Sequence, residues 1–354
     1  MRIAILSFSS EGQLLGRRLR EALEGRGSDC TLRRCPEGGL REWTQNHFLS
    51  NEALIFVGSC GLAVRAIAPF VQSKSSDPAV LVIDETGKFV ISLLSGHLGG
   101  ANELTKWVAE ELSATPVITT ATDRRGLFAV DSWARRNGYF VSNPEKIKEV
   151  SSALLEGKTV TFCSDFPISG KVPEQLRLLQ RDCSEAEREA GEQKPGEIDF
   201  SVSWQRRESE ELRIVVPSLY IGIGTRKGIS SEAVEQLVDH CLKELKASPL
   251  AVKAVASIDL KANEEGIFEC CARHAWTFLS FSQEELARVE GDFSASAFVK
   301  EVTGVDNVCE RSAVLAAGQG SRLLLRKQSL DGVTCAIALE AISLSFDTAQ
   351  PPQP

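Results

Sequence analysis

Histidine is scarce in this chain of 354 residues, which has four of them, at positions 47, 97, 240 and 274. No two lie at a spacing typical of metal ligands, so a metal site built by the protein is not expected. Long apolar runs are also missing: no stretch of 18 uninterrupted apolar residues occurs, and no membrane span is expected. The opening MRIAIL is too short for a signal peptide and predicts a strand.

Positive charge is in deficit, because 40 lysines and arginines stand against 48 aspartates and glutamates, a formal net charge of −8. Nucleic acids require a dense basic surface, so they are not expected as partners, although one local basic pocket could hold a small anion. Cys-x-x-Cys pairs are absent among the ten cysteines. In a chain of this length, that absence favours reduced thiols in a cytoplasmic protein, several of them buried as small apolar side chains.

What the sequence does contain is material for several α/β cores. Apolar residues make up 43% and charged residues 25%, as in ordinary globular proteins, and the length suggests two or three domains. Strand and helix candidates alternate early in the chain. We therefore expect the α/β class: an N-terminal three-layer α/β domain over residues 1–140, a small central α/β segment over 141–217, a separate C-terminal α/β domain with a mixed sheet over 218–343, and a disordered tail over 344–354. The central segment includes a polar stretch near residues 181–199 that we expect to be flexible.

The stretch ISLLSGHLGGANELT, residues 91–105, places His97 in a glycine-rich turn between a strand and a helix. Backbone N–H groups at a helix N-terminus, together with the helix dipole, would stabilise an anion or a developing oxyanion. His97 is a candidate general base acting on water. Glu103, in the first helical turn, could orient the imidazole or simply complement the dipole. The structural alternative is that the glycines only form a turn and a cap.

Acidic and hydroxyl side chains follow two other strand candidates. Asp84 and Glu85 lie in the turn of a predicted hairpin, and TTATD, residues 119–123, ends a strand. Ligands in open α/β sheets lie beyond the carboxyl ends of strands, which favours a binding or catalytic role for such residues. Adjacent carboxylates in a turn are commonly solvated, and a threonine or aspartate after a strand commonly caps a helix, so structural roles stay open.

Cationic side chains follow two glycine-bearing strand-to-helix junctions. VGSCGLAVR, which ends at Arg65, and GIGTRKGIS, which contains Arg226 and Lys227, could each hold a carboxylate. The second lacks both G-x-G-x-x-G and the G-K-[ST] of a P-loop, so nucleotide binding is weakly supported. Glu310 and Arg311 begin a helix of small residues, where a glutamate ordinarily complements the dipole. Tight packing with exposed cations is the structural alternative at all three places.

Taken together, these motifs resemble the cobalt-precorrin-5A hydrolase family of anaerobic cobalamin biosynthesis. The resemblance rests on DPAVLVIDETGKFVISLLSGHLGGANELT, followed by PVITTATD and FAVDSWARRNG, and on GSCGLAVRAIAPF, GIGTRKGIS and VCERSAVLAAG. It covers nearly the whole chain except the polar stretch. One departure is Thr225, which stands where the family more usually has cysteine.

The resemblance implies a hydrolase acting on a carbon–carbon bond. Its substrate would be a cobalt-corrinoid with a δ-lactone between the ring A acetate and the meso carbon C20. Water opens the lactone, and C20 leaves with its methyl group as acetaldehyde, giving cobalt-precorrin-5B. No cofactor and no protein-bound metal are implied, because the cobalt arrives with the substrate. Two kinds of protein partner stay open: neighbouring enzymes of the cobalamin pathway, and a second copy of the chain in a homodimer.

Residue type and motif membership suggest two sets of residues for this chemistry. The candidate catalytic groups are His97, Glu103, Asp84 and Asp123. The candidate substrate-binding residues are Gly58, Gly61, Arg65, Glu85, Gly96, Gly99, Gly100, Asn102, Thr120, Thr122, Gly224, Arg226, Lys227, Glu310 and Arg311. Lys74 is a further candidate cation for the acetate and propionate arms of the corrinoid.

Two other functions stay open on the sequence. The chain could be a corrinoid-binding or carrier protein without chemistry of its own, because its C-terminal part resembles a small stand-alone domain of the aerobic cobalamin pathway. A carrier would not obviously need the SGHLGGAN block. The third possibility is a nucleotide-dependent enzyme that uses GIGTRKG, which would bind a dinucleotide or a nucleoside triphosphate.

Overall fold

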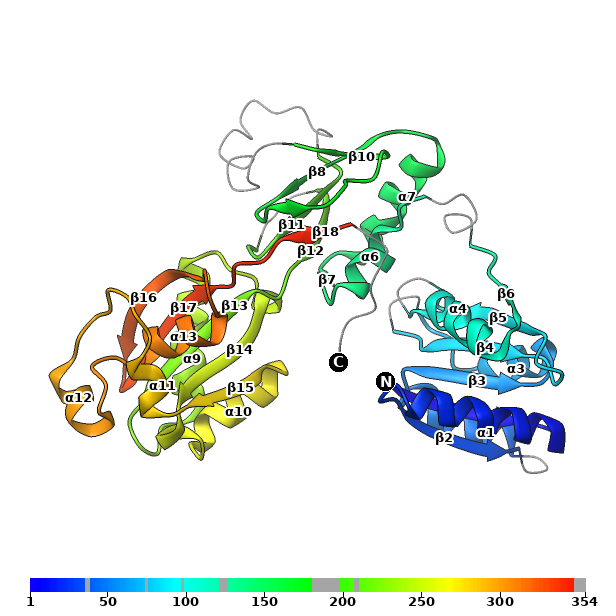
Figure 1. The fold of residues 1–354 in the computed structure, drawn as a ribbon, viewed down its shortest axis with the longest axis horizontal. Coiled ribbons are helices and arrows are strands. Elements are labelled where there is room, and N and C mark those ends of the chain that lie inside the picture. Colours follow the sequence, from blue (N-terminus) through cyan, green and yellow to red (C-terminus); the bar gives the residue numbers. More distant parts are fainter. Residues whose placement is uncertain are drawn as a thin grey trace. The chain divides into compact units, whose positions relative to one another are not determined.

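The computed structural model describes residues 1–35, 39–73, 76–96, 99–120, 127–179, 198–206 and 210–346, and only the backbone of residue 298 (Figure 1). The described residues form two compact units. Unit 1 comprises Met1–Asn137 and Ile147–Thr159, and unit 2 comprises Gly138–Lys146 and the residues from Val160 onward. Residues 147–159, which we expected in the central segment, therefore pack with the N-terminal part of the chain.

Unit 1 is built on a six-stranded sheet with the order β2-β1-β3-β4-β5-β6. The strands are β1 (Arg2–Ser7), β2 (Asp29–Arg34), β3 (Ala53–Val57), β4 (Ala79–Ile83), β5 (Phe89–Leu94) and β6 (Thr115–Val117). The first four are parallel, whereas β5 runs antiparallel to β4 and β6 runs parallel to β5. The predicted hairpin around residues 84–88 is confirmed.

Helices cover both faces of this sheet. Alternate side chains of β1, β3 and β4 point to opposite faces, as strand geometry requires. One set packs on α1 (Ser10–Glu24) and α4 (Ala101–Leu112), and the other packs on α2 (Leu40–Phe48) and α3 (Cys60–Ile67). The helices α6 (Val130–Arg136) and α7 (Ile147–Leu155) contact each other. The expected three-layer α/β arrangement is confirmed.

Unit 2 begins with a five-stranded sheet whose order is β10-β8-β11-β12-β7. Its strands are β7 (Phe140–Val141), β8 (Val160–Ser164), β10 (Leu176–Leu178), β11 (Phe200–Ser203) and β12 (Leu212–Val215), of which β7 alone is antiparallel to its neighbour. A strand near the end of the chain, β18 (Leu344–Ser345), pairs with β9 (Ile168–Ser169). The prediction of a disordered tail from residue 344 is wrong for these residues, because Leu344 and Phe346 are buried apolar side chains.

The other sheet of unit 2 is mixed, as predicted, with the order β15-β14-β13-β17-β16. It contains β13 (Leu219–Thr225), β14 (Val252–Ile258), β15 (Thr277–Phe281), β16 (Arg322–Leu330) and β17 (Val333–Leu339). The helix α13 (Cys309–Ala317) packs on β13, β14 and β17. The helix α9 (Ser231–Glu244) contacts β16 and β17 and packs against α10 (Glu265–His274). Short helices complete the unit: η1 (Pro144–Lys146), η2 (Pro249–Ala251), η3 (Asp259–Lys261), α11 (Gln283–Ala287) and α12 (Ala297–Thr303).

No helix in the part of the chain that the structure describes has the length and apolar character needed to cross a membrane.

Candidate functional site

The glycine-rich turn between β5 and α4 is tightly built. Ser95 and Gly100 both have left-handed backbone conformations, with φ of 56° and 80°. The N–H of Ala101 donates to the Ser95 carbonyl (3.1 Å), and the N–H of Asn102 donates to the Gly96 carbonyl (3.0 Å). These two helical N–H groups are thus already occupied and do not point at a free anion site. His97, the predicted base in this turn, lies outside the described residues.

Asn102 ties three segments together beneath this turn. Its side chain is 3% exposed. The Ser92 hydroxyl on β5 donates to Asn102 Oδ1 (2.7 Å), and Asn102 Nδ2 donates to the Thr120 hydroxyl (3.0 Å) just beyond β6. The structure therefore brings two of the predicted binding residues, Asn102 and Thr120, into direct contact. Thr122 and Asp123 lie outside the described residues.

Glu103 forms an ion-pair cluster that the sequence reasoning missed. Its carboxylate pairs with Arg135 and with Arg136, whose Nε lies 3.3 Å from Glu103 Oε1. The Arg135 guanidinium also lies across Gly100, so that a Cβ atom at residue 100 would collide with it. A signal for both arginines was present in WARRNG, because they lie in the last turn of α6, but cations there ordinarily serve only the helix dipole.

The hairpin between β4 and β5 divides the predicted residues of unit 1 into two groups. Because β5 is antiparallel to β4, its end, with the turn before α4, lies at the amino edge of the parallel strands. The end of β6 lies at the same edge, since β6 is parallel to β5. Gly96, Gly99, Gly100, Asn102, Glu103 and Thr120 therefore share one edge of the sheet. Gly58, Gly61, Arg65, Asp84 and Glu85 follow β3 and β4 at the carboxyl edge.

Asp84 serves the hairpin turn at this carboxyl edge. Its carboxylate accepts hydrogen bonds from the N–H of Phe89 (2.6 Å) and the N–H of Thr86 (3.1 Å), and from the Thr86 hydroxyl. Partial burial opposes ionisation, but these hydrogen bonds outweigh it, so the pKa of Asp84 lies below its ordinary value. At about 3.3 Å per residue, the length of β5 separates Asp84 from the turn before α4 by roughly 20 Å.

In unit 2, Arg226 and Lys227 are exposed on the loop that follows β13. The N–H of Arg226 donates to the Gly332 carbonyl (2.9 Å), and the Thr334 hydroxyl donates to the Gly224 carbonyl (3.1 Å). The first contact joins the loop to the turn between β16 and β17, and the second joins the end of β13 to β17. The Thr225 hydroxyl is buried without a hydrogen-bond partner among the described residues.

Glu310 and Arg311 have side chains that bind other residues of unit 2. Glu310 is fully buried, and its carboxylate accepts from the N–H and hydroxyl of Ser294 (2.7 and 2.9 Å), from Asn307 Nδ2 (3.0 Å) and from the N–H of Lys327 (2.7 Å). Its predicted contact with substrate is corrected, because no part of the carboxylate is left for a ligand. Arg311 donates to the Val289 carbonyl (2.7 Å) and pairs with Asp306 (3.0 Å).

Comparison with known proteins identifies the family of this chain. Family models described as Cobalamin synthesis G N-terminal, Cobalamin biosynthesis central region and Cobalamin synthesis G C-terminus match residues 42–123, 128–217 and 219–338. A protein of Priestia megaterium named Cobalt-precorrin-5A hydrolase is 33% identical over 85% of this chain and 82% of its own length. A protein of the same name from Salmonella typhimurium (strain LT2) is 35% identical over 86% of each chain.

The chain belongs to the cobalt-precorrin-5A hydrolase family. The resemblance predicted from the motifs is confirmed. Within this family's N-terminal match lie the turn before α4, Glu103 and Thr120, and within its C-terminal match lies the loop with Arg226 and Lys227. A protein of Sinorhizobium named Protein CobE is 28% identical over 34% of this chain and 79% of its own length.

Proposed function

We propose that this hydrolase of cobalamin synthesis acts on cobalt-precorrin-5A, opens its ring A δ-lactone with water and releases C20 with its methyl group as acetaldehyde. The observation that carries the proposal is the identity of 33% and 35% to two cobalt-precorrin-5A hydrolases, over more than four-fifths of each chain. Water adds to the lactone carbonyl, and the bond between the carbonyl carbon and the ring oxygen breaks, which frees the ring A acetate as a carboxylic acid and leaves a hydroxyl on C20. This hydroxyl loses its proton, the aldehyde forms as the C20–macrocycle bond breaks, and the electron pair of that bond passes to the macrocycle, which takes up a proton.

We place the chemistry at the amino edge of the unit 1 sheet. His97 would take the proton from water, and Asp123, in the segment that follows Thr120, is a second candidate for proton transfer. Glu103 pairs with the guanidinium groups of Arg135 and Arg136 and so fixes two cations beside the turn. Those cations support a developing oxyanion. We leave Asp84 out of this set, because the length of a strand separates it from the turn.

The carboxylate arms of the corrinoid require cations, and we propose Arg226 and Lys227 for this role. Both residues are exposed. Arg65 is left out for the same reason as Asp84, because it follows β3 at the carboxyl edge. Charge-assisted hydrogen bonds from arginine to carboxylate are strong enough to orient such arms. We propose no separate cofactor, since the substrate brings its own cobalt.

The test is anaerobic incubation of the full chain with cobalt-precorrin-5A, followed by measurement of acetaldehyde, with His97→Ala as the comparison. We expect acetaldehyde from the unmodified chain and a loss of at least about 100-fold in the variant, the usual contribution of a general base. Equal acetaldehyde from both would keep the activity and remove His97 as the base.

The carrier function is the second candidate, favoured by the similarity of 34% of the chain to Protein CobE. It predicts that the corrinoid binds to the chain and is recovered unchanged. Bound corrinoid without acetaldehyde, under conditions in which a known cobalt-precorrin-5A hydrolase turns over, would replace the hydrolase proposal by this one.

A further inference from the structure

The loop between β13 and α9, residues 226–230, presents the neighbouring cations Arg226 and Lys227. Cations on an exposed loop bind a multivalent anion well only if the loop holds one conformation, since ordering a mobile loop costs free energy on binding. The 226–230 loop is fixed at its first residue by the hydrogen bond from Arg226 N–H to the Gly332 carbonyl (2.9 Å). Its other attachments lie in the segment that follows β14.

Glu264 attaches the far end of the loop. Its Oε1 accepts from the N–H groups of Gly228 and Ile229, the second at 3.3 Å. Its Oε2 lies 3.0 Å from Lys261 Nζ, and the two side chains are only 9% and 16% exposed. Burial opposes ionisation of Glu264, but Lys261 and the two N–H groups outweigh it, so the pKa of this carboxyl lies below its ordinary value.

The backbone of α10 adds a steric contact to this electrostatic one. A Cβ atom at Gly266 would collide with the Ile229 carbonyl oxygen, and it would lie 2.9 Å from the Ser230 carbonyl carbon. Only glycine allows the helix to approach the loop so closely. The hydrogen bonds that Glu264 accepts fix residues 228 and 229, and the contact at Gly266 fixes residues 229 and 230, so the two restraints overlap at Ile229.

This arrangement changes what the loop can bind. Successive N–H groups in a glycine-bearing loop before a helix are the usual donors to a phosphate. Here the N–H groups of Gly228 and Ile229 already bind an internal carboxylate. These two N–H groups are therefore not available to a phosphate, which weakens the support for a nucleotide site at GIGTRKG, whereas the exposed side chains of Arg226 and Lys227 are compatible with carboxylate arms.

We propose that Glu264 is a positioning residue, which holds the 226–230 loop so that Arg226 and Lys227 form a fixed pair of cations for two carboxylate arms of a corrinoid. The inference rests on the proposed substrate class. It does not require that unit 2 take part in the bond-breaking steps.

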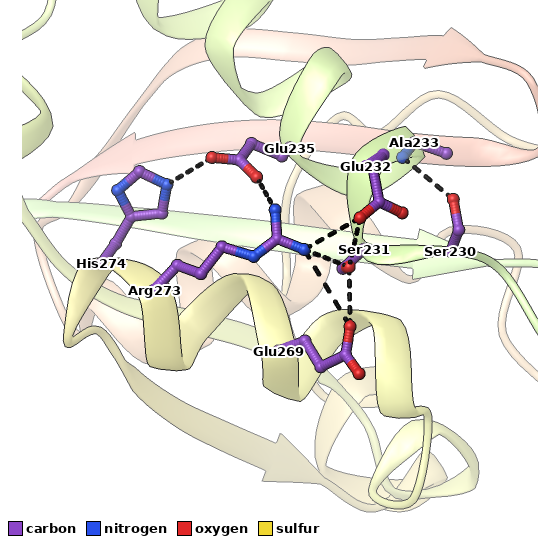
Figure 2. A network of polar contacts seen from close by, with 8 residues as sticks. All are labelled: Ser230, Ser231, Glu232, Ala233, Glu235, Glu269, Arg273 and His274. Atoms are coloured by element: carbon purple, nitrogen blue, oxygen red, sulfur yellow. Dashed lines mark hydrogen bonds and ion pairs between the residues drawn. The ribbon is translucent and has the colours of Figure 1, made fainter.

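A second network on the same helices supplies a matched control. Arg273 on α10 pairs with Glu235 and Glu232 on α9 and donates to Ser231, while Glu235 also contacts His274 (3.1 Å) (Figure 2). The Arg273 side chain is 42% exposed, and exposed pairs contribute little. Figure 2 shows Glu235 pointing toward Arg273 and His274, so Glu235→Gln removes a glutamate of the α9–α10 contact without altering a bond to the loop.

The test compares the full-length chain with Glu264→Ala, Glu264→Gln, Glu235→Gln and the double variant Arg226→Ala/Lys227→Ala. The probe is cobyrinic acid, a stable corrinoid with free carboxylate arms, and the readouts are its Kd and amide hydrogen exchange over residues 226–230. We expect faster exchange in Glu264→Ala and a Kd raised about tenfold, equivalent to about 1.4 kcal/mol. Glu264→Gln, which keeps the size and one acceptor oxygen, should be intermediate, and Glu235→Gln should match the unmodified chain.

The double-mutant comparison decides between positioning and general damage. If Glu264 acts through the two cations, Glu264→Ala should add nothing to the Kd of the Arg226→Ala/Lys227→Ala chain. An equal loss of affinity in both backgrounds, unchanged exchange in Glu264→Ala, or faster exchange with unchanged Kd would each overturn the proposal. Binding is read without turnover, so a chain that binds the probe but releases no acetaldehyde from cobalt-precorrin-5A would refute the hydrolase chemistry alone.

Discussion

At the scale of single residues, Gly100 and Gly61 both lie in glycine-bearing junctions between a strand and a helix, but only one of them requires glycine. Gly100 has a φ of 80° and lies against the Arg135 guanidinium, whereas a Cβ at Gly61, in the first turn of α3, would meet nothing within 4 Å. At residue 100, both the left-handed backbone conformation and the position of the Arg135 guanidinium require that there be no side chain. Residue 61 has no such requirement.

Gly100→Ala should therefore destabilise the chain by on the order of 2 kcal/mol, through backbone strain and displacement of Arg135 from Glu103. Gly61→Ala is the matched control and should be neutral or raise stability by up to about 1 kcal/mol, because alanine favours helix. Thermal melts of both variants check this. Equal melting temperatures for the two would show that the turn can rearrange around a side chain.

Glu310 is the residue whose substitution we expect to cost most. A fully buried carboxylate that accepts four hydrogen bonds leaves several donors unpaired when it is removed. We expect Glu310→Ala to lower the free energy of unfolding by about 3 kcal/mol or more. Glu232→Gln, at a side chain that is 75% exposed, is the control and should leave the free energy of unfolding nearly unchanged. A small effect of Glu310→Ala in urea denaturation would contradict the burial.

At the scale of elements, the β4–β5 hairpin shows how far the sequence predicts the site. The hairpin around Asp84 was predicted correctly from DETGK between two apolar runs. What the hairpin means for the site was not predicted. Because β5 runs antiparallel to β4, it takes the chain from the carboxyl edge of the sheet to the amino edge, so Asp84 and the turn before α4 cannot belong to one catalytic cluster. The partners Arg135 and Arg136 of Glu103 could not be predicted, because their contact depends on tertiary packing of α6.

The helices α2, α10 and α11 were not predicted from the sequence, and the composition of the first two explains why. The helix α10 has Gly266 in its first turn and two cysteines, all poor helix formers, and packing against α9 overrides these propensities. Gly266 lies where the helix touches the 226–230 loop, which leaves no room for a side chain. The helix α2 is short, at nine residues, and polar over most of its length. The strands β7, β9 and β18 contain only two residues each, too few for a periodic pattern.

The hairpin also predicts a pH dependence. The folded pKa of Asp84 is depressed, so its ionised form stabilises the fold at neutral pH, and this contribution is lost as the pH falls through that folded pKa. Asp84→Asn should thus cost about 1 kcal/mol at pH 7. The difference from the unmodified chain should shrink as the pH is lowered, in denaturation curves recorded at a series of pH values. A constant difference would show that the carboxylate charge is unimportant.

At the scale of the whole molecule, the net charge of −8 opposes a substrate that carries many carboxylates. Local cations must outweigh this long-range repulsion, and salt separates the two effects, since charges more than about 8 Å apart are screened at physiological ionic strength. In the unmodified chain, salt should raise KM by weakening the contacts to Arg226 and Lys227.

In the Arg226→Ala/Lys227→Ala chain, only repulsion would remain at this loop, so salt should lower KM or leave it unchanged. Measurement of KM for acetaldehyde release between low and physiological salt checks the change of sign. If both chains show the same rise of KM with salt, the cations that pair with the substrate lie elsewhere.

The pairing of β18 with β9 has a consequence for the order of events during synthesis. Phe346 packs against Phe162, with ring centroids 5.4 Å apart, and Leu344 and Ser345 align with Ile168 and Ser169. Residues 160–170 leave the ribosome long before residues 344–346 have been made, and domains tend to fold in the order in which they emerge. The strand β9 and the Phe162 ring therefore lack these partners until the mixed sheet of residues 219–339 has been translated. These contacts can form only after translation has reached residue 346.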